Sequence, residues 1–318
     1  MTVSLDEEDR MSAWLEGKPL AEKMKAEVAE KVSYYKNKTG RVPGLVGILV
    51  GENKSSQVYL RSKERASQQV GIAARVLRLP ADIAAGALKA TIETLNRDEN
   101  VDGILVQLPL PSPLDPLDII SVIDPAKDAD GIHPVTLGRL LQNQDVLKAC
   151  TPLGILELLK FHRIPLAGQE AVIIGRSLIV GKPLALMLTN ENATVTVCHS
   201  KTRDLAAVAR RADILVAAMG QTAFVTPDFV KTGAVVVDVG INSVSDSGIV
   251  AGLFGNDAGR LKDLAEKGYT LVGDVHPDVF PKASAMTPVP GGVGLLTVAA
   301  LMKNTLQAFI RLKGLGPA

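Results

Sequence analysis

Hydrophobic residues in this sequence recur at two different spacings. In the segment 19–38, Leu20, Met24, Val28 and Val32 fall every four residues, which predicts a helix with one buried face. Farther along, short runs of valine, isoleucine and leucine alternate with longer stretches of helical spacing. Because runs that are apolar throughout are typical of strands covered on both faces, this alternation predicts parallel sheets built from β–α–β units.

The predicted elements fall into two series. The first comprises strands at 46–50, 75–79 and 103–107 and helices at 55–70 and 84–95. The second comprises a helix that Thr151 caps and Pro152 begins, strands at 171–174, 194–198, 214–218, 234–239 and 269–273, and helices at 182–188, 205–212 and 294–312. The charged segment 1–16 has no periodicity and is expected to be a mobile arm.

We therefore predict an α/β fold of two α/β domains with a cleft between them, the second a Rossmann-type nucleotide-binding domain. The first domain is expected to span 1–148 and the second 149–293, with a boundary near 148–151. The last helix, within 294–318, is long enough to return to the first domain.

Composition excludes several classes of function. The 318 residues include 35 Lys and Arg against 34 Asp and Glu, and only 3% are aromatic, so no surface for nucleic acid is expected. The acidic N-terminus is unlike a secretory signal, and no run of about 18 apolar residues predicts a membrane span. Cys150 and Cys198 cannot form a disulfide scaffold and fit a reducing compartment. We expect a cytoplasmic protein with a small-molecule partner. The four histidines lack metal-ligand spacing, so no metal site is expected.

A glycine turn joins the predicted strand 171–174 to the helix that follows it. Gly175, Arg176 and Ser177 open this turn, and a strand, glycine turn and helix in this order point backbone N–H groups at a phosphate. The spacing is not G-x-G-x-x-G, because Ser177 stands where the middle glycine would be. A tight turn without a ligand is the alternative interpretation.

The end of the next strand distinguishes the two nicotinamide cofactors. NAD enzymes place a carboxylate about 20 residues beyond the glycine turn, on the ribose hydroxyl. Here the strand ends in CHSKTR, without an acid. Arg176, Ser200 and Lys201 would instead suit a 2′-phosphate, so NADP is predicted in preference to NAD. The alternative is that Lys201 and Arg203 are simply solvated.

Polar residues in the first domain suggest a second site. Tyr59 and Lys63 lie four residues apart on one predicted helix, so they share a face, although most such pairs are surface neighbours. The pair matches the Y-x-x-x-K of short-chain dehydrogenases, but it precedes the glycine turn, whereas in those enzymes it follows. Gln107 ends a predicted strand, where ligands sit in open parallel sheets.

Two loops complete the candidate chemistry. In KDADGIHP, Asp128, Asp130 and His133 cluster, and a carboxylate here could accept N–H groups of a ligand or cap a turn beside Gly131. The segment TPVPGGVG, residues 287–294, precedes the last helix, and its glycines permit close approach of the backbone to a ligand.

Taken in order, these motifs closely resemble the bifunctional methylenetetrahydrofolate dehydrogenase/methenyltetrahydrofolate cyclohydrolase family. The resemblance covers roughly residues 14–312 and rests on YLRSKERASQQVGI (59–72), DGILVQLPLP (102–111), KDADGIHPVTLGRL (127–140), CTPLGI (150–155), GRSLIVGKPLA (175–185), VTVCHSKT (195–202), VVVDVGIN (235–242) and TPVPGGVG (287–294). It implies oxidation of 5,10-methylenetetrahydrofolate with NADP, hydrolysis to 10-formyltetrahydrofolate, folate binding in the cleft between the domains, and a homodimer.

The resemblance also assigns roles to residues. Lys63 would be the central catalytic residue, with Tyr59 stacking near the folate, Gln107 orienting Lys63, and Asp130 holding the pterin. The folate site would be lined by Val106, Leu108, Pro290, Gly291, Gly292, Val293 and Gly294. NADP would be held by Gly175, Arg176, Ser177, Ser200 and Ile241.

These residue types suit the chemistry. An ionised Asp130 can accept paired hydrogen bonds from the pterin, and hydride transfer needs only close placement of two rings. The methenyl cation disfavours an ammonium beside it, so a neutral Lys63 could act as the base for attack by water.

Three alternatives remain at this point: a dehydrogenase without cyclohydrolase activity, a folate-binding protein without turnover, and another two-domain oxidoreductase such as a shikimate or amino-acid dehydrogenase. Intact Lys63 and Gln107 argue against the first, and the glycine turn argues against the second. The sequence departs from the family pattern at Arg65, Thr136, Ala149 and Leu295-Leu296, which leaves the relative rates of the two activities open.

Overall fold

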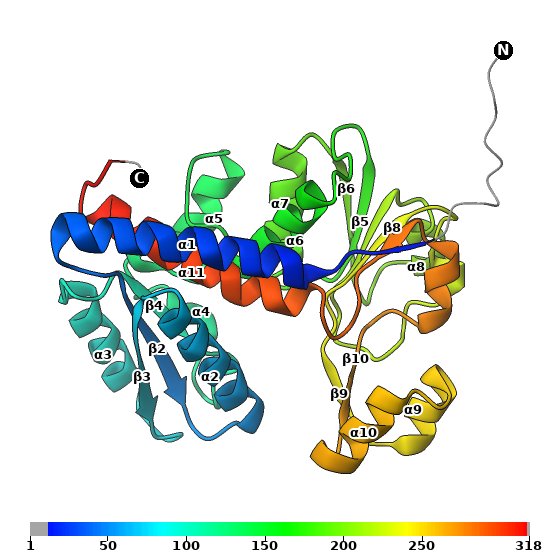
Figure 1. Ribbon diagram of the computed structural model, residues 1–318, viewed down its shortest axis with the longest axis horizontal. Coiled ribbons are helices and arrows are strands. Elements are labelled where there is room, and N and C mark those ends of the chain that lie inside the picture. Colours follow the sequence, from blue (N-terminus) through cyan, green and yellow to red (C-terminus); the bar gives the residue numbers. More distant parts are fainter. Residues whose placement is uncertain (1–11, 317–318) are drawn as a thin grey trace. The chain divides into compact units, whose positions relative to one another are not determined.

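The computed structural model describes residues 12–316, apart from the side chains at 54 and 55 (Figure 1). It divides into two compact units, which are described separately. The three-stranded unit comprises Pro19–Gly154 and the chain from Leu295 onward, and the six-stranded unit comprises the chain up to Lys18 and Ile155–Gly294. The units change at Gly154, a few residues beyond the expected boundary, and the segment before Pro19 groups with the second unit.

The three-stranded unit is built around one buried strand. Its parallel sheet has the order β3-β2-β4, with β2 (Gly44–Val50) in the centre, β3 (Ala73–Leu79) on one side and β4 (Gly103–Val106) on the other. Every residue of β2 is buried, as its apolar sequence predicts. The edge strand β3 instead alternates exposed and half-buried residues, so the expectation of strands covered on both faces is wrong for it.

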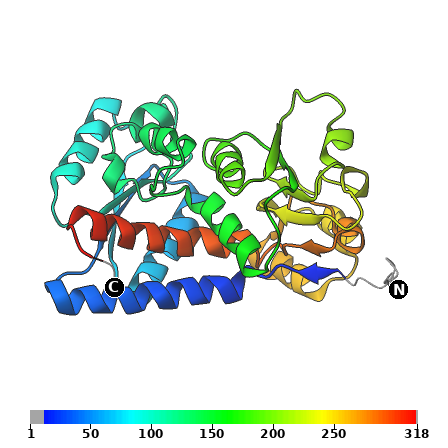
Figure 2. The same ribbon diagram turned by 90° about the horizontal axis from the view of Figure 1, so that it is seen from above.

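Helices complete this unit. They are α1 (Gly17–Thr39), α2 (Lys54–Gln69), α3 (Ala85–Arg97), α4 (Pro116–Ile120), the 3-10 helix η2 (Pro125–Lys127), α5 (Pro134–Leu141), the start of α6 (Cys150–Phe161) and most of α11 (Val293–Leu312). Figure 2 shows α1 and α11 running side by side. Fully buried Tyr35 of α1 meets Phe309 of α11 edge-on, with ring centroids 6.2 Å apart.

The apolar character of α11 comes from its place in the core. Among the described residues, α11 alone is long and apolar enough to cross a membrane, with a mean hydropathy of 1.4 over its most apolar window. However, 61% of that window is buried inside the protein. A buried core helix passes the same test of length and composition, so this helix is weak evidence for a membrane span.

The six-stranded unit contains one parallel sheet of order β1-β11-β8-β7-β5-β6 in the described chain. Its strands are β1 (Ala13–Trp14), β5 (Glu170–Ile174), β6 (Thr194–Cys198), β7 (Ile214–Ala217), β8 (Val235–Asp238) and β11 (Ala285–Met286). The central strands β7 and β8 are buried throughout, which explains why their apolar runs were readable in the sequence.

The N-terminal segment is ordered where the structure describes it. β1 pairs with β11, and Trp14 stacks on Phe280 with ring centroids 4.0 Å apart. The expectation of a mobile arm is therefore wrong for residues 12–16, because Leu15 beyond this strand is buried. The rest of that expectation falls on residues 1–11, which lie outside the described residues.

The helices of this unit are α7 (Gly181–Asn190), α8 (Leu205–Ala209), α9 (Ser247–Phe254) and α10 (Ala258–Lys267), with the 3-10 helices η3 (Pro227–Phe229) and η4 (Pro277–Lys282). The predicted strand at 269–273 is β10 (Thr270–Val272), but it pairs antiparallel with β9 (Asn242–Val244) and does not join the parallel sheet. Helices α9 and α10, between these two strands, were not predicted.

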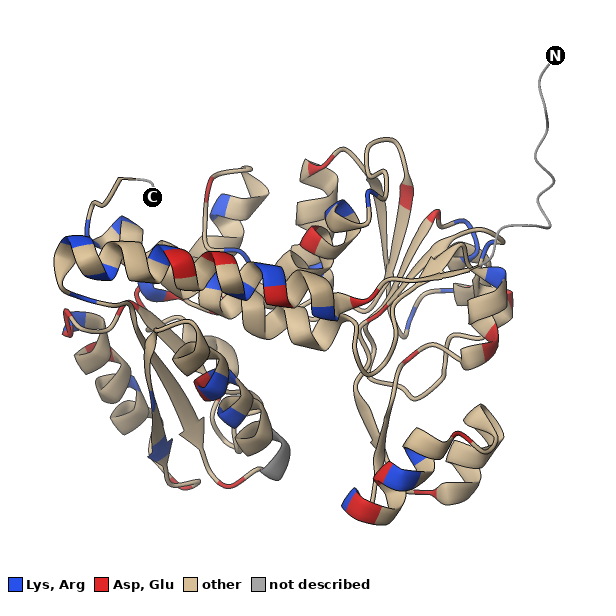
Figure 3. Cartoon of the chain, in the orientation of Figure 1, with Lys and Arg blue, Asp and Glu red and all other residues tan. Residues whose placement is uncertain are grey.

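Charged side chains of both signs share the surface. Figure 3 shows Lys and Arg interspersed with Asp and Glu along α1, in keeping with the near-zero net charge of +1. Of the described residues, no group of three or more His, Cys, Asp or Glu has the arrangement of a metal site.

Candidate active site

Lys63 of α2 lies beside two polar groups from elsewhere in the three-stranded unit. Its Nζ donates a hydrogen bond to Oε1 of Gln107 at 3.2 Å and is 4.0 Å from Oδ1 of Asp130. The side chains of Lys63 and Asp130 are only 12% and 22% exposed. The structure therefore brings together three of the residues predicted for catalysis, and leaves each within reach of a ligand.

The amide of Gln107 is held with its oxygen toward the lysine. Its Nε2 donates to the carbonyl of Leu108 at 2.9 Å, and its backbone N–H donates to the carbonyl of Ile48 in β2. Because Nε2 is engaged, Oε1 is the atom that faces Lys63. Val106, the last residue of β4, is buried, whereas Leu108 is half-buried just beyond it.

Tyr59 lies one turn before Lys63 on the same helix. It is 40% exposed, and partial burial raises the pKa of its phenol. The ring is therefore neutral at physiological pH and presents an apolar face with a hydroxyl, which suits stacking on a planar ligand.

The two carboxylates of the KDADGIHP motif, Asp128 and Asp130, lie in different environments. Asp128 is 1% exposed and accepts hydrogen bonds from the backbone N–H groups of Gly131 at 3.1 Å and His133 at 2.8 Å. Burial, with a contribution from nearby Asp130, raises its pKa to about 7. The turn-capping interpretation thus applies to Asp128, which leaves Asp130 as the carboxylate available to a ligand.

His133 is also structural. Its Nδ1 accepts from the N–H of Val135 and caps α5, while its Nε2 lies 3.2 Å from the carbonyl of Ser121. Both ring nitrogens are therefore occupied within the protein, which leaves neither for a ligand.

Asn304 of α11 braces the Asp130 loop and was missed by the sequence analysis. Its Nδ2 donates to the carbonyls of Ala129 at 2.9 Å and Lys148 at 2.8 Å, and the side chain is 1% exposed. The signal was an amide inside an otherwise apolar helix, since a buried polar group needs partners.

The prediction that Thr151 caps α6 is wrong. The helix begins at Cys150, and the Thr151 hydroxyl is hydrogen-bonded to that of Thr297 on α11 at 2.9 Å. The Cys150 side chain is buried, and this burial raises the pKa of its thiol well above the usual value, which disfavours the reactive thiolate.

The glycine turn of the six-stranded unit requires its glycines. Gly175 has φ +135°, and a Cβ there would collide with the carbonyl oxygen of Ala218. At Gly181 a Cβ would collide with the carbonyl of Gly175. The Ser177 hydroxyl accepts hydrogen bonds from the N–H groups of Val180 at 3.1 Å and Gly181 at 3.4 Å, so this serine holds the turn that leads into α7.

The other predicted cofactor residues are exposed at one edge of the sheet. Arg176 follows β5, Ser200 follows β6 and Ile241 follows β8, and all three strands are parallel. Because the carboxyl ends of parallel strands share an edge, these side chains lie where a doubly wound sheet binds ligands. Ile241 is 41% exposed and its Cδ1 packs against Gly294.

Two buried carboxylates support this edge and were also missed. Asp274 is fully buried and accepts from the backbone N–H groups of Met219 at 2.7 Å, Gly220 at 2.9 Å and Gln221 at 2.9 Å. It also accepts from Nδ2 of Asn242, next to Ile241. One carboxylate therefore ties the loop after β7 to the chain after β8.

Asp238, at the end of β8, joins the same network. Its carboxylate accepts from the N–H groups of Gly240, Asp274 and Val275 at 2.9 to 3.0 Å. Burial raises its pKa to about 7. A carboxylate directly after an apolar strand was the available signal, because it stands where functional side chains of parallel sheets are found.

The loop at 287–294 is anchored from several sides. Thr287 accepts from the N–H of Asp238 at 2.7 Å, and the carbonyl of Gly291 accepts from the N–H of Gly17 at 3.0 Å. A Cβ at Gly292 would crowd the carbonyl of Pro288. Pro290 is exposed, so the middle of this loop faces outward.

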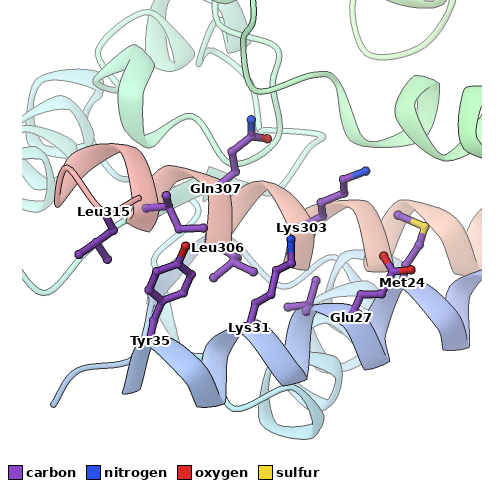
Figure 4. Close-up of a pocket in the computed structure, with 10 residues that line it drawn as sticks. Met24, Glu27, Lys31, Tyr35, Lys303, Leu306, Gln307 and Leu315 are labelled. Carbon is purple, nitrogen blue, oxygen red and sulfur yellow. The ribbon is translucent and has the colours of Figure 1, made fainter. Parts of the chain in front are cut away.

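A pocket of about 430 Å³ lies elsewhere, between α1 and α11 of the three-stranded unit. Figure 4 shows Tyr35, Lys31 and Lys303 around it, with Leu306 among the apolar residues. It contains none of the predicted site residues, so pocket size alone would misplace the chemistry.

Comparison with known proteins decides the family. A family model described as the catalytic domain of tetrahydrofolate dehydrogenase/cyclohydrolase matches residues 15–130, and its NAD(P)-binding domain matches residues 149–313. The chain belongs to this family. The predicted resemblance and the two-domain α/β fold with a Rossmann-type second domain are thereby confirmed, and a shikimate or amino-acid dehydrogenase is excluded.

Relatives of the family agree over nearly the whole chain. The Bifunctional protein FolD of Koribacter versatilis is 49% identical over 294 residues, covering 92% of this chain and 95% of its own. The crystal structure of the bifunctional FolD enzyme of Campylobacter jejuni has a TM-score of 0.85 at 42% identity and covers 95% of this chain and 99% of its own. The Trypanosoma brucei FolD structure, complexed with NADP cofactor and an inhibitor, has a TM-score of 0.86 at 38% identity, with coverage of 95% and 98%.

Proposed function

We propose that this chain oxidises 5,10-methylenetetrahydrofolate with NADP and then hydrolyses the methenyl product to 10-formyltetrahydrofolate, with Lys63 as the base of the second reaction. The observation that carries this proposal is the amine of Lys63, largely buried and placed between Gln107 and Asp130. Family membership supplies the two activities, and this cluster supplies a residue able to perform the hydrolytic one.

The six-stranded unit fits a dinucleotide phosphate. The turn at Gly175 has no room for a side chain, so the chain takes the tight path from strand to helix that dinucleotide-binding turns require. Exposed Arg176 and Ser200 offer a cation and a hydroxyl for the 2′-phosphate, with no acid in the CHSKTR segment to repel it. When bound, NADP supplies the hydride acceptor, and the chain needs only to position the two rings.

Hydrolysis needs a general base, and binding of the substrate favours the neutral amine of Lys63 that could serve as one. In the free protein, Oδ1 of Asp130 lies 4.0 Å from Nζ of Lys63. When the pterin donates its N–H groups to Asp130, this carboxylate is engaged by the substrate, and the methenyl cation disfavours a second positive charge beside it. Gln107 accepts one N–H of the amine, which orients the nitrogen lone pair.

The proton balance follows from this arrangement. Water adds to the methenyl carbon, and Lys63 takes a proton from the water as the C–O bond forms. The C–N5 bond then breaks, the hydroxyl proton moves to N5, and the carbonyl of the formyl group forms on N10. The proton on Lys63 leaves to solvent, which restores the neutral amine.

Lys63→Met tests the proposal. The variant, followed by methenyl absorbance with NADP or NAD, should still form methenyltetrahydrofolate but lose its hydrolysis by at least about a hundredfold, the range expected for removal of a general base. NADP binding should be unchanged. An unaltered decay of methenyl absorbance in this variant would refute the role of Lys63.

Other properties follow as part of the same proposal. We place Tyr59 against the folate ring, and assign the folate lining to Val106, Leu108 and 290–294. The protein is expected to be a cytoplasmic homodimer that uses folate one-carbon substrates and prefers NADP to NAD. It is expected to bind neither nucleic acid nor membrane, in keeping with its near-zero net charge and low aromatic content. A dehydrogenase-only activity is less well supported, since Lys63 and Gln107 are both present and in contact.

A further inference from the structure

Residues 245–269, which include helices α9 and α10, form an excursion from the rest of the six-stranded unit. Neither of the two proposed reactions uses a residue of this segment. The strands β9 and β10 pair directly, with Val244 opposite Thr270, and residues 245–269 lie between them. Figure 1 shows α9 and α10 beyond the ends of these strands, apart from the parallel sheet of the same unit. Their core is small: Val244, Val250 and Val272 are buried, and α10 has no buried residue.

One residue of α10 reaches back from this excursion. The guanidinium of Arg260 stacks on the ring of Phe254, with its central carbon 3.6 Å from the ring centroid. Nη1 donates to the carbonyl of Leu271 in β10 at 2.6 Å, and Nη2 donates to the carbonyl of Val289 at 2.8 Å. The planar fork of an arginine directs two separate nitrogens at the two carbonyls, whereas a lysine has a single nitrogen on a flexible stem.

Val289 places this contact at the loop before the last helix. It directly precedes Pro290, the first residue of the stretch 290–294 assigned to folate. Thr287 anchors the loop at its start and Gly17 anchors it at the carbonyl of Gly291. Arg260 holds the backbone between these two anchors, immediately before the exposed Pro290.

We propose that Arg260 is a positioning residue for folate binding, which sets the backbone of 289–294 through the carbonyl of Val289. The excursion α9–α10 then serves as the support that brings this guanidinium to the loop and stacks it on Phe254. The inference rests on the proposed assignment of 290–294 to folate. A loop that contacts the substrate equally before and during reaction affects KM and leaves kcat unchanged.

The test uses the cyclohydrolase reaction, which needs no NADP. Arg260→Met removes both hydrogen bonds and keeps an apolar chain on Phe254, and we expect KM for methenyltetrahydrofolate to rise roughly tenfold with kcat unchanged. Arg260→Lys should recover only part of this loss, because the single nitrogen of a lysine replaces two separately placed donors, Nη1 and Nη2. Lys262→Met on the same helix is the matched control, since Lys262 pairs only at the surface, 3.9 Å from Glu266.

NADP affinity and melting temperature are measured for each of these point variants, and both should match the wild type. Replacement of residues 245–269 by Asn-Gly, a turn that closes two-residue hairpins, should keep the pairing of β9 with β10 and reproduce the raised KM. This second variant removes the support as a whole and does not depend on how Arg260→Met packs.

Several results would overturn the inference. One is a KM for methenyltetrahydrofolate within twofold of the wild type, in Arg260→Met or in the variant that lacks residues 245–269. Another is a rise in KM for NADP without a rise in KM for folate. A third is a fall in kcat as large as the rise in KM, or a lowered melting temperature in Arg260→Met. If the wild-type chain lacks cyclohydrolase activity, the proposed function fails instead, and the two failures are told apart before any variant is compared.

Discussion

The amine of Lys63 and the amide oxygen of Gln107 are 3.2 Å apart, although the two residues come from a helix and from the end of a strand. The helix α2 and the strand β4 both pack on β2, so the pair is set by the core of the three-stranded unit. An amine placed in this way keeps its orientation whether or not a ligand is bound.

Gln107→Leu should reduce cyclohydrolase activity. Leucine keeps the volume but removes the acceptor of the Lys63 N–H, so the amine is free to turn away from the methenyl carbon. We expect kcat of hydrolysis to fall by about 10- to 100-fold, with NADP affinity unchanged. Gln57→Leu, on the helix α2 that carries Lys63, is the control. Equal hydrolysis rates for Gln107→Leu and the wild type would contradict the orienting role.

Asp274→Asn should impair the dehydrogenase selectively. Asparagine places an NH₂ group against N–H donors of residues 219–221, so the loop after β7 loses a hydrogen bond and gains a repulsive contact. We expect KM for NADP to rise about tenfold while hydrolysis of methenyltetrahydrofolate stays within twofold. The surface variant Asp263→Asn should behave as wild type. A parallel loss of both activities would point instead to general unfolding.

Arg176→Met should change the choice of cofactor. If Arg176 binds the 2′-phosphate, its loss removes a charge-assisted hydrogen bond, which corresponds to roughly a 10- to 100-fold rise in KM for NADP. KM for NAD, which lacks that phosphate, should change less than twofold. Arg203→Met serves as the control for charge alone. A uniform weakening of NADP and NAD would show that Arg176 acts elsewhere on the dinucleotide.

The stability of the protein should carry a pH-dependent contribution from Asp128 and Asp238. Burial raises the pKa of each carboxyl to about 7, above its unfolded value, so the folded state binds more protons between about pH 4 and 7. Their contribution is therefore fully present below pH 4 and is lost as pH rises to 7. Each group accounts for a slope of at most about 1.4 kcal/mol per pH unit.

Urea unfolding at pH 5, 6, 7 and 8 measures this effect. The informative quantity is the slope of the free energy of unfolding, compared between the wild type and Asp238→Asn, because the variant also loses hydrogen bonds at every pH. We expect the decrease with pH to be shallower in the variant. Identical slopes would mean that Asp238 ionises in the folded protein as readily as in the unfolded chain.

The elements predicted most accurately from the sequence are buried strands, which appear as continuous runs of apolar residues. Strands β5, β7 and β8 are runs of apolar residues because both faces are covered, and each was located within a residue or two. The short helices α9 and α10 were missed because they contribute little to the core: α9 has one buried residue, Val250, and Leu264 of α10 is only half-buried against the same small cluster. Their capping residues, Asp246 and Asp257, were present as signals of helix starts.

The candidate site was predictable only in part for a related reason. Lys63 and Tyr59 could be placed on one helix face by spacing, but spacing says nothing of which of two neighbouring carboxylates is buried. Asp128 and Asp130 differ in role because the chain folds one inward onto backbone N–H groups and leaves the other beside Lys63. Arg260 and Asp274 act on loops distant in the sequence, which a single sequence does not reveal.

The last helix, α11, has a consequence for how the polypeptide is made. Its buried residues Met302, Thr305 and Phe309 belong to the unit that also contains Lys63, and Asn304 holds the carbonyls of Ala129 and Lys148. Synthesis proceeds from the N-terminus, so residues 19–154 of that unit emerge first, yet they lack α11 until the intervening residues 155–292 have also been made. The unit whose chain is translated first is thus the last to acquire its native packing, and a truncation within α11 would disable it.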